Sequence, residues 1–300
     1  MEKVAVLMSS YNGEEFIREQ IDSILGQEGV ETALHVRDDG STDSTQEILE
    51  EYRKQGKLRW YTGDNLKPAK SFMDLIATVE TDAEYIALSD QDDVWLPEKL
   101  KTATEALKEF PKDRPAMYYG NTKLVDRELK EIRQEPATYV SLTMKQSVIS
   151  SGCTGCTLCM NRTLFELLRQ RPMVFTMIHD MWIHKLCVAA GGNLYFDREP
   201  HILYRQHGGN EIGGQSTLNK RVKRHFRTVF GNQCYRSKCC NALYKAYGDI
   251  MPEENRKICE LVLNYHKGLN RFRIIFDKGY RLGDKRLDLI FTVSVLLGVF

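Results

Sequence analysis

The 300-residue sequence has no excess of charge of either sign, no cysteine in its first half and no long apolar run. It carries 42 Lys and Arg against 41 Asp and Glu, so the overall composition gives no reason to expect a nucleic-acid partner. Val4–Met8 is too short for the apolar core of a secretory signal peptide. The uncharged stretch 289–300 is shorter than the ~20 residues that a membrane-spanning helix needs. These absences predict a cytoplasmic protein.

The eight cysteines all lie between positions 153 and 259, which is too sparse for a disulfide-stapled scaffold and predicts reduced thiols. Cys153, Cys156 and Cys159 follow one another with two-residue gaps, a spacing that invites comparison with an iron–sulfur cluster. A bacterial cluster sequence would need a fourth cysteine at position 163, where this chain has Thr163. We therefore expect small buried thiols on a glycine-rich strand or loop.

Short apolar runs alternate with apolar residues at helical spacing along the first 110 residues. The predicted strands are 4–8, 33–37, 58–61 and 85–88, and the predicted helices lie at 14–25, around 48–52, and at 72–79. This alternation predicts an α/β fold with a mostly parallel central sheet flanked by helices. Later in the chain we expect strands at 117–119, 122–125, 195–196 and 202–205, a polar segment at 141–147, and helices at 163–169 and from 178 to about 190.

Three of the predicted strands end in polar loops, which are 9–13, 38–43 and 89–93. The carboxyl ends of parallel strands share one edge of a sheet, so these loops should converge on one ligand. The third loop contains Asp90, Asp92 and Asp93, and three carboxylates this close repel one another unless a cation lies between them. Mg²⁺ prefers such oxygen ligands. The alternative interpretation is that these residues cap the next helix, whose first turn holds Pro97.

The motifs together resemble those of a known family. Ser9-Ser10-Tyr11-Asn12, Asp38-Asp39-Gly40-Ser41-Thr42-Asp43 and Asp90-Gln91-Asp92-Asp93-Val94-Trp95 are similar to the motifs of family 2 glycosyltransferases, which are inverting enzymes with the GT-A fold. His179-Asp180-Met181-Trp182 and Tyr204-Arg205-Gln206-His207-Gly208-Gly209-Asn210 resemble the rhamnosyltransferase-like subgroup. The resemblance covers residues 1 to about 215 and implies a GT-A fold, Rossmann-like, with a C-terminal helical appendage.

The resemblance implies roles for residues of the first half of the chain. Ser9, Tyr11 and Asp39 would hold the nucleotide base and ribose, with help from Asp38, and Lys70 would contact a phosphate. Asp90 would contact the donor ribose or the metal ion. The implied donor is a dTDP- or UDP-sugar.

Further roles concern the metal ion and the chemistry. Asp90 and Asp92 match the DxD motif, in which Asp92 would ligate Mg²⁺ or Mn²⁺, and His207 would reach the metal or the diphosphate. Asp180 matches the catalytic base, although an N-cap role and a zinc site shared with His184 stay open. For His207, an ordinary loop histidine stays open too. Gln91 and the segment 153–159 identify no acceptor.

The last part of the sequence differs in composition. Lys220, Arg221, Lys223, Arg224 and Arg227 alternate with apolar residues at helical spacing, and no acidic residue occurs between 212 and 248. A basic amphipathic helix is typical of attachment to an anionic membrane surface, and a helix packed on its own domain is the alternative. Nucleic-acid binding is the weaker third interpretation. We therefore expect attachment to the inner face of the plasma membrane through the basic and apolar C-terminal stretches.

The sequence thus predicts a GT-A domain over 1–215, divided into a nucleotide-binding half (1–110) and an acceptor-binding half (111–215), followed by a helical extension over 216–300. The predicted function is metal-dependent, inverting transfer of a sugar, with dTDP-L-rhamnose as the candidate donor, to a lipid-linked saccharide in cell-surface polysaccharide synthesis. The alternatives are a sugar nucleotidyltransferase, against which the single glycine of the 9–13 loop counts, and a non-catalytic nucleotide-sugar-binding protein.

Overall fold

A computed structural model describes residues 1–132, 139–171, 178–207 and 234–300. Its main sheet has seven strands in the order β3-β2-β1-β4-β8-β6-β9. The strands of this sheet are β1 (Glu2–Ser10), β2 (Val30–Asp38), β3 (Leu58–Thr62), β4 (Tyr85–Ser89), β6 (Ala116–Gly120), β8 (Cys159–Asn161) and β9 (Asn193–Asp197). Only β8 runs antiparallel to its neighbours, β4 and β6. The predicted α/β class with a mostly parallel sheet is confirmed.

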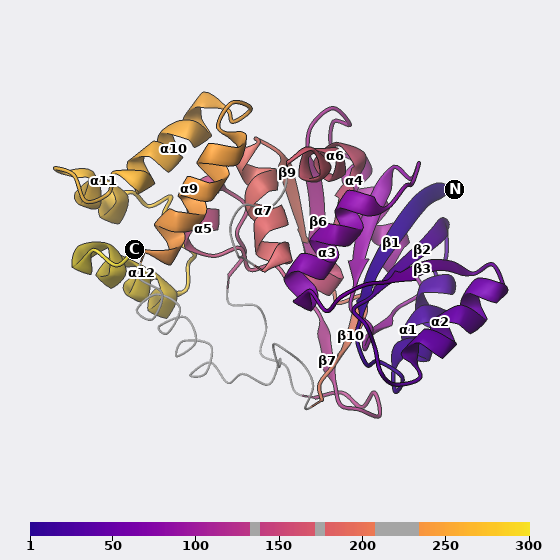
Figure 1. Cartoon of the computed structure of the whole chain (residues 1–300). Coiled ribbons are helices and arrows are strands. Elements are labelled where there is room, and N and C mark those ends of the chain that lie inside the picture. The colour runs from indigo at the N-terminus through magenta and orange to yellow at the C-terminus, as the bar shows by residue number, and fades with distance from the viewer. Residues whose placement is uncertain (133–138, 172–177, 208–233) are drawn as a thin grey trace.

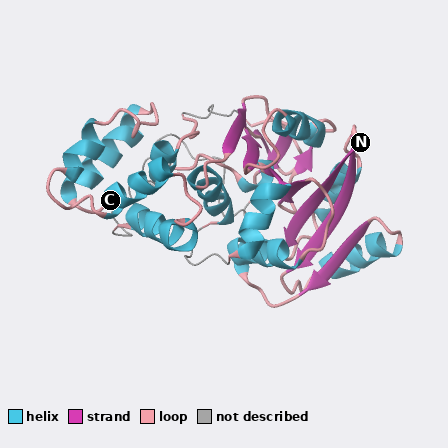
Figure 2. Ribbon diagram, turned by 90° about the horizontal axis from the view of Figure 1, so that it is seen from above, coloured by secondary structure: helices cyan, strands magenta, loops and turns pink. Residues whose placement is uncertain are grey.

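Helices cover both faces of this sheet (Figures 1 and 2). The helices of the first 170 residues are α1 (Ile17–Leu25), α2 (Thr45–Lys54), α3 (Lys67–Thr78), α4 (Lys99–Lys108), α5 (Met144–Ile149) and α6 (Arg162–Gln170). Side chains alternate along β1, so Val4, Val6 and Met8 pack with α1, α2 and α4, whereas Ala5 and Leu7 pack with α3 and α6. The sheet therefore separates two apolar cores, as expected for strands buried on both faces.

A small second sheet lies beside the carboxyl ends of the main strands and has the order β5-β10-β7. Its strands are β5 (Val94–Trp95), β7 (Lys123–Val125) and β10 (Ile202–Arg205). β10 runs antiparallel to β5, with Leu203 opposite Val94. The end of β10 therefore lies against residues 89–93, which precede β5 and are called the acidic loop below.

The C-terminal helices lie at the end of the molecule opposite α1 and α2, in orange and yellow in Figure 1. These helices are α9 (Tyr235–Tyr247), α10 (Glu253–Leu263), α11 (Asn270–Phe276) and α12 (Lys285–Leu297). α9 packs on α5 and on α7 (His179–Ala189), α10 packs on α9 and α5, and the buried side chains of all four helices join the same core as α3. The predicted helical appendage is thus confirmed, while the domain boundary near 215 and the basic segment 220–227 lie outside the described residues.

One helix was not predicted from the sequence. The segment 141–147 was expected only to be polar, and the structure shows that Met144–Ile149 form the helix α5. The Thr143 side chain caps it by accepting a hydrogen bond from Gln146 N, and Val148 and Ile149 are buried beneath α7 and α9. Tertiary burial of a few apolar side chains therefore sets the structure of a segment whose composition is largely polar.

Candidate active site

The three polar loops meet at one edge of the main sheet, as predicted. β1 lies between β2 and β4 and is parallel to both, with Ser10 opposite Asp38 and Met8 opposite Ser89. The loop after β1 contacts the other two loops. Asn12 N donates to Ser41 Oγ at 2.8 Å, and Gln91 Nε2 donates to Tyr11 O at 3.0 Å.

Gln91 fixes the backbone beside Tyr11. Tyr11 N donates to Gln91 Oε1 at 2.9 Å, so the amide of Gln91 makes a two-point contact with this peptide unit. A Cβ atom at Gly13 would come within 2.3 Å of Gln91 Oε1, so any other residue there would require the Gln91 side chain to move. The Tyr11 side chain itself is 44% exposed and so is open to a ligand.

The predicted nucleotide-binding carboxylates at the end of β2 are buried and already bonded. Asp38 accepts hydrogen bonds from Ser41 N at 2.9 Å and Gln46 Nε2 at 2.8 Å. Asp39 forms an ion pair with Arg37 and accepts from Leu66 N at 3.0 Å. Through these contacts both carboxylates hold the loop that follows β2 in its conformation.

The remaining two predicted nucleotide contacts lie around the start of α3. Ser9 Oγ lies 2.7 Å from Ser71 Oγ, which joins the end of β1 to α3. Lys70, the residue before Ser71, is exposed in the first part of the same helix. Their assigned roles stay predictions.

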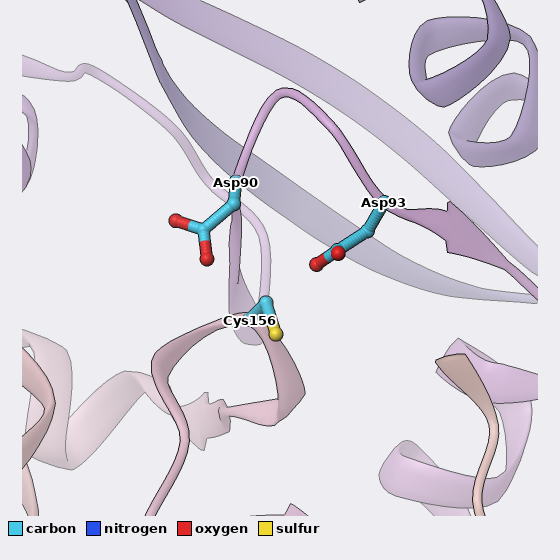
Figure 3. Close-up of side chains that lie close together, drawn as sticks. All are labelled: Asp90, Asp93 and Cys156. Atoms are coloured by element: carbon cyan, nitrogen blue, oxygen red, sulfur yellow. The ribbon is translucent and has the colours of Figure 1, made fainter. Parts of the chain in front are cut away.

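Asp90, Asp93 and Cys156 come together beneath the acidic loop (Figure 3). One ligand atom of each residue lies within 4.8 Å of the others. Cys156 belongs to the 3-10 turn η1 (Gly155–Thr157), which is held against β4 by the bond from Leu88 N to Leu158 O at 3.1 Å. Of the three thiols that were predicted to be buried, Cys156 and Cys159 are buried and Cys153 is half-buried. Nothing in the sequence pattern indicated that Cys156 would face the carboxylates.

The electrostatics of this cluster are unusual because Asp93 is completely buried. Its Oδ1 accepts from Arg205 N at 3.2 Å, and Oδ2 accepts from no nitrogen or oxygen of the described chain. Burial raises the pKa of Asp93 well above its usual value, and the charges of Asp92 and Asp90 raise it further. Burial also lowers the pKa of Lys99, whose Nζ lies 3.5 Å from the Trp95 ring centre, to about 8.

Asp92, in the same loop, contacts His207. Asp92 Oδ2 lies 2.7 Å from His207 Nε2, and both side chains are largely buried. The His207 ring also packs on Phe16, with ring centres 4.9 Å apart. The structure thus brings together the two residues predicted to share a metal ion.

Arg205 is a site residue to which the sequence analysis gave no role. Its buried guanidinium forms an ion pair with Glu19, lies 4.6 Å from the Phe16 ring centre and donates from Nε to Asp92 O at 2.9 Å. Together with the bond from its backbone N to Asp93, these contacts attach β10 to the acidic loop. The feature of the sequence that could have identified Arg205 as a site residue is its position two residues before His207.

Asp180 lies in the first turn of α7 and is buried. Its Oδ1 accepts from Met181 N at 2.6 Å. Burial raises the pKa of Asp180 from 3.8 to about 6, partly offset by backbone hydrogen bonds from Met181 and Gly155. Because Gly155 contacts Asp180 and the next residue, Cys156, contacts the acidic loop, η1 connects the predicted base to the predicted metal site.

The histidines near Asp180 do not form a zinc site with it. His184 is buried, with Nδ1 3.2 Å from Ser147 Oγ and Nε2 2.9 Å from Ser141 O. Both ring nitrogens are therefore used within the core, so the zinc hypothesis for Asp180 and His184 was wrong. His179 packs on the Phe72 ring at 4.2 Å, and burial lowers its pKa to about 3.

The donor set fits a hard divalent cation. Asp90, Asp92 and Asp93 offer carboxylate oxygens, which suit Mg²⁺ and Mn²⁺, and His207 adds an imidazole nitrogen. Burial and the charges of Asp93 and Asp90 raise the pKa of the Cys156 thiol well above its usual value, so this sulfur stays protonated beside the carboxylates. An uncompensated buried carboxylate such as Asp93 is also what a cation would stabilise.

Two relatives of known description are similar to this chain in sequence. It is 29% identical over 260 residues to the dTDP-rhamnosyl transferase RfbG of Shigella flexneri, covering 79% of this chain and 84% of the relative. It is 27% identical to the Escherichia coli UDP-Glc:alpha-D-GlcNAc-diphosphoundecaprenol beta-1,3-glucosyltransferase WfgD, covering 59% of this chain and 65% of the relative.

Solved structures share the fold. TarS residues 1–349 of S. aureus, crystallised with UDP-GlcNAc, match with a TM-score of 0.59 at 17% identity, covering all of this chain and 82% of that chain. GalNAc-T7 with UDP, GalNAc and Mn²⁺ matches with a TM-score of 0.54 at 13% identity, covering 88% of this chain and 55% of that chain. The GT-A architecture predicted from the motifs is confirmed. Residues 5–169 also match the model of glycosyl transferase family 2, which is more than half of the chain. The chain therefore belongs to glycosyl transferase family 2.

Proposed function

We propose that this glycosyltransferase moves a sugar, with inversion, from a nucleotide diphosphate donor to a lipid-linked saccharide during cell-surface polysaccharide synthesis. The candidate donor is dTDP-L-rhamnose, supported by the relative described as a dTDP-rhamnosyl transferase. The lipid-linked acceptor is supported by the relative whose described substrate is a diphosphoundecaprenol. The observation that carries the proposal is the buried Asp180, whose pKa of about 6 suits a base, joined through η1 to the acidic loop.

In the proposed reaction an acceptor hydroxyl attacks the anomeric carbon on the face opposite the nucleotide. A bond forms between the acceptor oxygen and that carbon, the bond from the carbon to the phosphate oxygen breaks, and the nucleoside diphosphate leaves with the electron pair. Asp180 takes the hydroxyl proton on a carboxylate oxygen. Its orientation is fixed by the hydrogen bond from Met181 N, so the carboxylate needs no large rearrangement as the proton moves.

The acidic loop would hold the diphosphate end of the donor. Asp90, Asp92 and His207 would bind Mg²⁺ or Mn²⁺, which supplies neutralisation of the charge on the leaving diphosphate. Arg205 keeps Asp92 and Asp93 at their positions through its bonds to both. The exposed Tyr11 would pack on the nucleotide base, with Ser9 and Asp39 near the ribose and Lys70 near a phosphate.

The test is thermal unfolding with dTDP, UDP and GDP, each with and without Mg²⁺ or Mn²⁺. A ligand that binds only the folded state stabilises it by ~2.7 kcal/mol at a hundredfold excess over its dissociation constant. We expect a metal-dependent shift with dTDP and a smaller one with the other two nucleotides. A shift with UDP alone would mean that the donor is a UDP-sugar. No shift with any of the three nucleotides would contradict the proposed activity. Transfer assays with the Asp180→Asn variant then separate an enzyme from a non-catalytic nucleotide-sugar binder.

Attachment to the inner face of the plasma membrane belongs to the same proposal. No helix within the described ranges is long and apolar enough to cross a membrane. Lys220, Arg221, Lys223 and Arg224 lie outside those ranges, so their contribution rests on the sequence pattern. Sedimentation with anionic vesicles should decrease when these four residues become Gln. Unchanged sedimentation would mean that the basic segment is not the anchor.

A further inference from the structure

The outer faces of α11 and α12 expose large apolar side chains to solvent. The C-terminal apolar patch, as we call it, consists of Leu269, Phe272, Phe276, Leu289, Leu296 and Leu297. Phe276 is 78% exposed, and Leu289 and Leu297 are each more than 60% exposed. Single exposed apolar residues are ordinary, but six on two adjoining helices indicate a surface that binds something.

The exposure follows from the helical geometry of both segments. Along α12, Leu289 and Leu296 are seven residues apart and share the outer face, whereas Leu287 and Phe291 lie on the inner face and are buried. Along α11, Phe272 and Phe276 are four residues apart, and their rings stack with centres 6.3 Å apart.

The two helices form one surface. α11 and α12 pack against each other, and Arg271 of α11 donates to Leu296 O of α12 at 3.2 Å. Figure 1 shows both helices at the end of the molecule that is farthest from α1 and α2. An amphipathic helix of a globular domain normally turns its polar face outward, so apolar side chains on the outer face of α12, in addition to those on its buried inner face, depart from the usual arrangement.

Positive charge surrounds this patch. Five exposed cationic side chains occur between residues 264 and 300, namely Lys267, Arg273, Lys278, Lys285 and Arg286. The acidic residues of the same stretch are already engaged in the fold. Asp277 pairs with Lys145 at 2.9 Å, Asp284 caps α12, and Asp288 accepts from Leu282 N at 2.8 Å. Residues 264–300 hold seven Lys and Arg against three Asp, so this part of the surface has an excess of positive charge beside its apolar side chains.

We propose that the C-terminal apolar patch and its cations form a docking surface for an anionic lipid bilayer. Side chains such as Phe276 and Leu289 enter the boundary between headgroups and acyl chains, while Lys285 and Arg286 contact anionic headgroups. Charge complementarity favours a bilayer over a second copy of this chain, because two such surfaces would bring ten exposed cations together. The inference rests on the proposed function in one respect, since a lipid-linked acceptor would be met at the same bilayer.

The experiment is sedimentation of the full chain with phosphatidylcholine vesicles that contain or lack phosphatidylglycerol. The test variant is Phe276→Gln with Leu289→Gln, and its matched control is Leu142→Gln with Ile250→Gln, which replaces two exposed apolar residues elsewhere. All four sites are exposed, so folding should be preserved. We expect the test variant to need about tenfold more lipid for half-maximal binding, and the control variant to bind like wild type.

A second pair of substitutions tests the electrostatic part. Lys285→Gln with Arg286→Gln should weaken binding several-fold on the anionic vesicles, and added salt should weaken wild-type binding in the same direction. Failure of wild type to bind anionic vesicles at low salt would overturn the proposal, as would equal losses in test and control variants. If instead wild type forms dimers that the test variant cannot form, and no vesicle binding is seen, the patch is a subunit interface.

Thermal unfolding with dTDP and Mn²⁺ is measured on the same samples. A nucleotide response without vesicle binding would refute the docking surface, together with the proposed membrane attachment, and would leave the proposed sugar transfer standing. Vesicle binding without a response to any nucleotide would refute the proposed function alone. The two hypotheses therefore fail separately.

Discussion

Asp92 and His207 are 115 residues apart in the sequence, yet Asp92 Oδ2 lies 2.7 Å from His207 Nε2. The pairing of β10 with β5 produces this proximity, because β5 begins directly after the acidic loop and β10 leads into His207. The contact places an imidazole beside the carboxylate that the family motif assigns to the metal ion. Movement of β10 and of the acidic loop is therefore coupled, and Arg205 strengthens the coupling.

The first prediction concerns this contact. His207→Ala should abolish most of the metal-dependent part of the stabilisation by dTDP, because one of the proposed ligands is lost. The measurement is the shift in unfolding temperature with dTDP, with and without Mn²⁺. His266→Ala, which removes an exposed histidine elsewhere, serves as control and should respond like wild type. An unchanged metal effect in His207→Ala would exclude His207 as a ligand.

The second prediction concerns the base. Asp180→Asn should lower kcat by about 10²–10⁴, since general-base catalysis is typically worth that much, while nucleotide binding is retained. Turnover and the dTDP-induced thermal shift are measured on the same protein. Asp113→Asn changes an exposed carboxylate and should leave both unaffected. Wild-type turnover by the Asp180 variant would mean that another group takes the proton.

The third prediction is a pH dependence. Only the carboxylate form of Asp180 accepts a proton, so kcat/KM should fall about tenfold per pH unit below about pH 6, which is the raised pKa of this group. A pH–rate profile of wild type gives this value directly. A profile with its acidic limb near pH 4 would indicate that the base is not a buried carboxyl group.

Asp180 should also make the free energy of unfolding depend on pH, in the direction opposite to that of kcat/KM. Because its folded-state pKa is raised from 3.8 to about 6, the favourable contribution of protonated Asp180 is complete below about pH 4 and is lost as pH rises through 6. The difference in unfolding free energy between Asp180→Asn and wild type should therefore increase by about 3 kcal/mol in favour of the variant from pH 4 to pH 7. Denaturant titrations at several pH values measure it, and a difference that is constant with pH would contradict it.

The fourth prediction concerns Arg205. Arg205→Met should lower the unfolding free energy by about 2–4 kcal/mol, because Asp92 O loses a buried hydrogen bond and the ion pair with Glu19 is broken. Arg169→Met breaks an ion pair with the exposed Glu80 and should cost no more than about 1 kcal/mol. Arg205→Lys keeps the charge but not the planar group, so its metal-dependent response to dTDP should be weakened as well. If Arg205→Met and Arg169→Met lower the unfolding free energy equally, Arg205 does not position the acidic loop.

The fifth prediction concerns the connection through η1. A Cβ atom at Gly155 would lie 2.7 Å from His179 Nε2 and 3.5 Å from Asp180 Cβ, so Gly155→Ala should displace the start of α7. We expect kcat to fall about 10–100-fold with little change in donor KM. Gly268→Ala, whose Cβ meets open space but whose φ is +51°, should lower stability without changing kcat. Unchanged kcat in Gly155→Ala would show that α7 adjusts freely.

The sequence by itself determined the first half of the fold and the location of the site. Apolar runs such as Val4–Met8 and Tyr85–Leu88, each followed by polar residues, were sufficient because strand formation and the edge at which parallel strands end follow from local pattern. The same reasoning identified the three loops and the apolar nature of 289–300.

Only the tertiary structure decided what the site residues contact. The antiparallel β8 lies between β4 and β6, and this insertion carries Cys156 beneath Asp93 and Gly155 against Asp180. No periodicity in the sequence encodes which distant strand becomes a neighbour, since that choice depends on how the whole apolar core closes. The raised pKa of Asp180 and the outward apolar face of α12 have the same origin, because burial is a property of the packed chain and not of the local sequence.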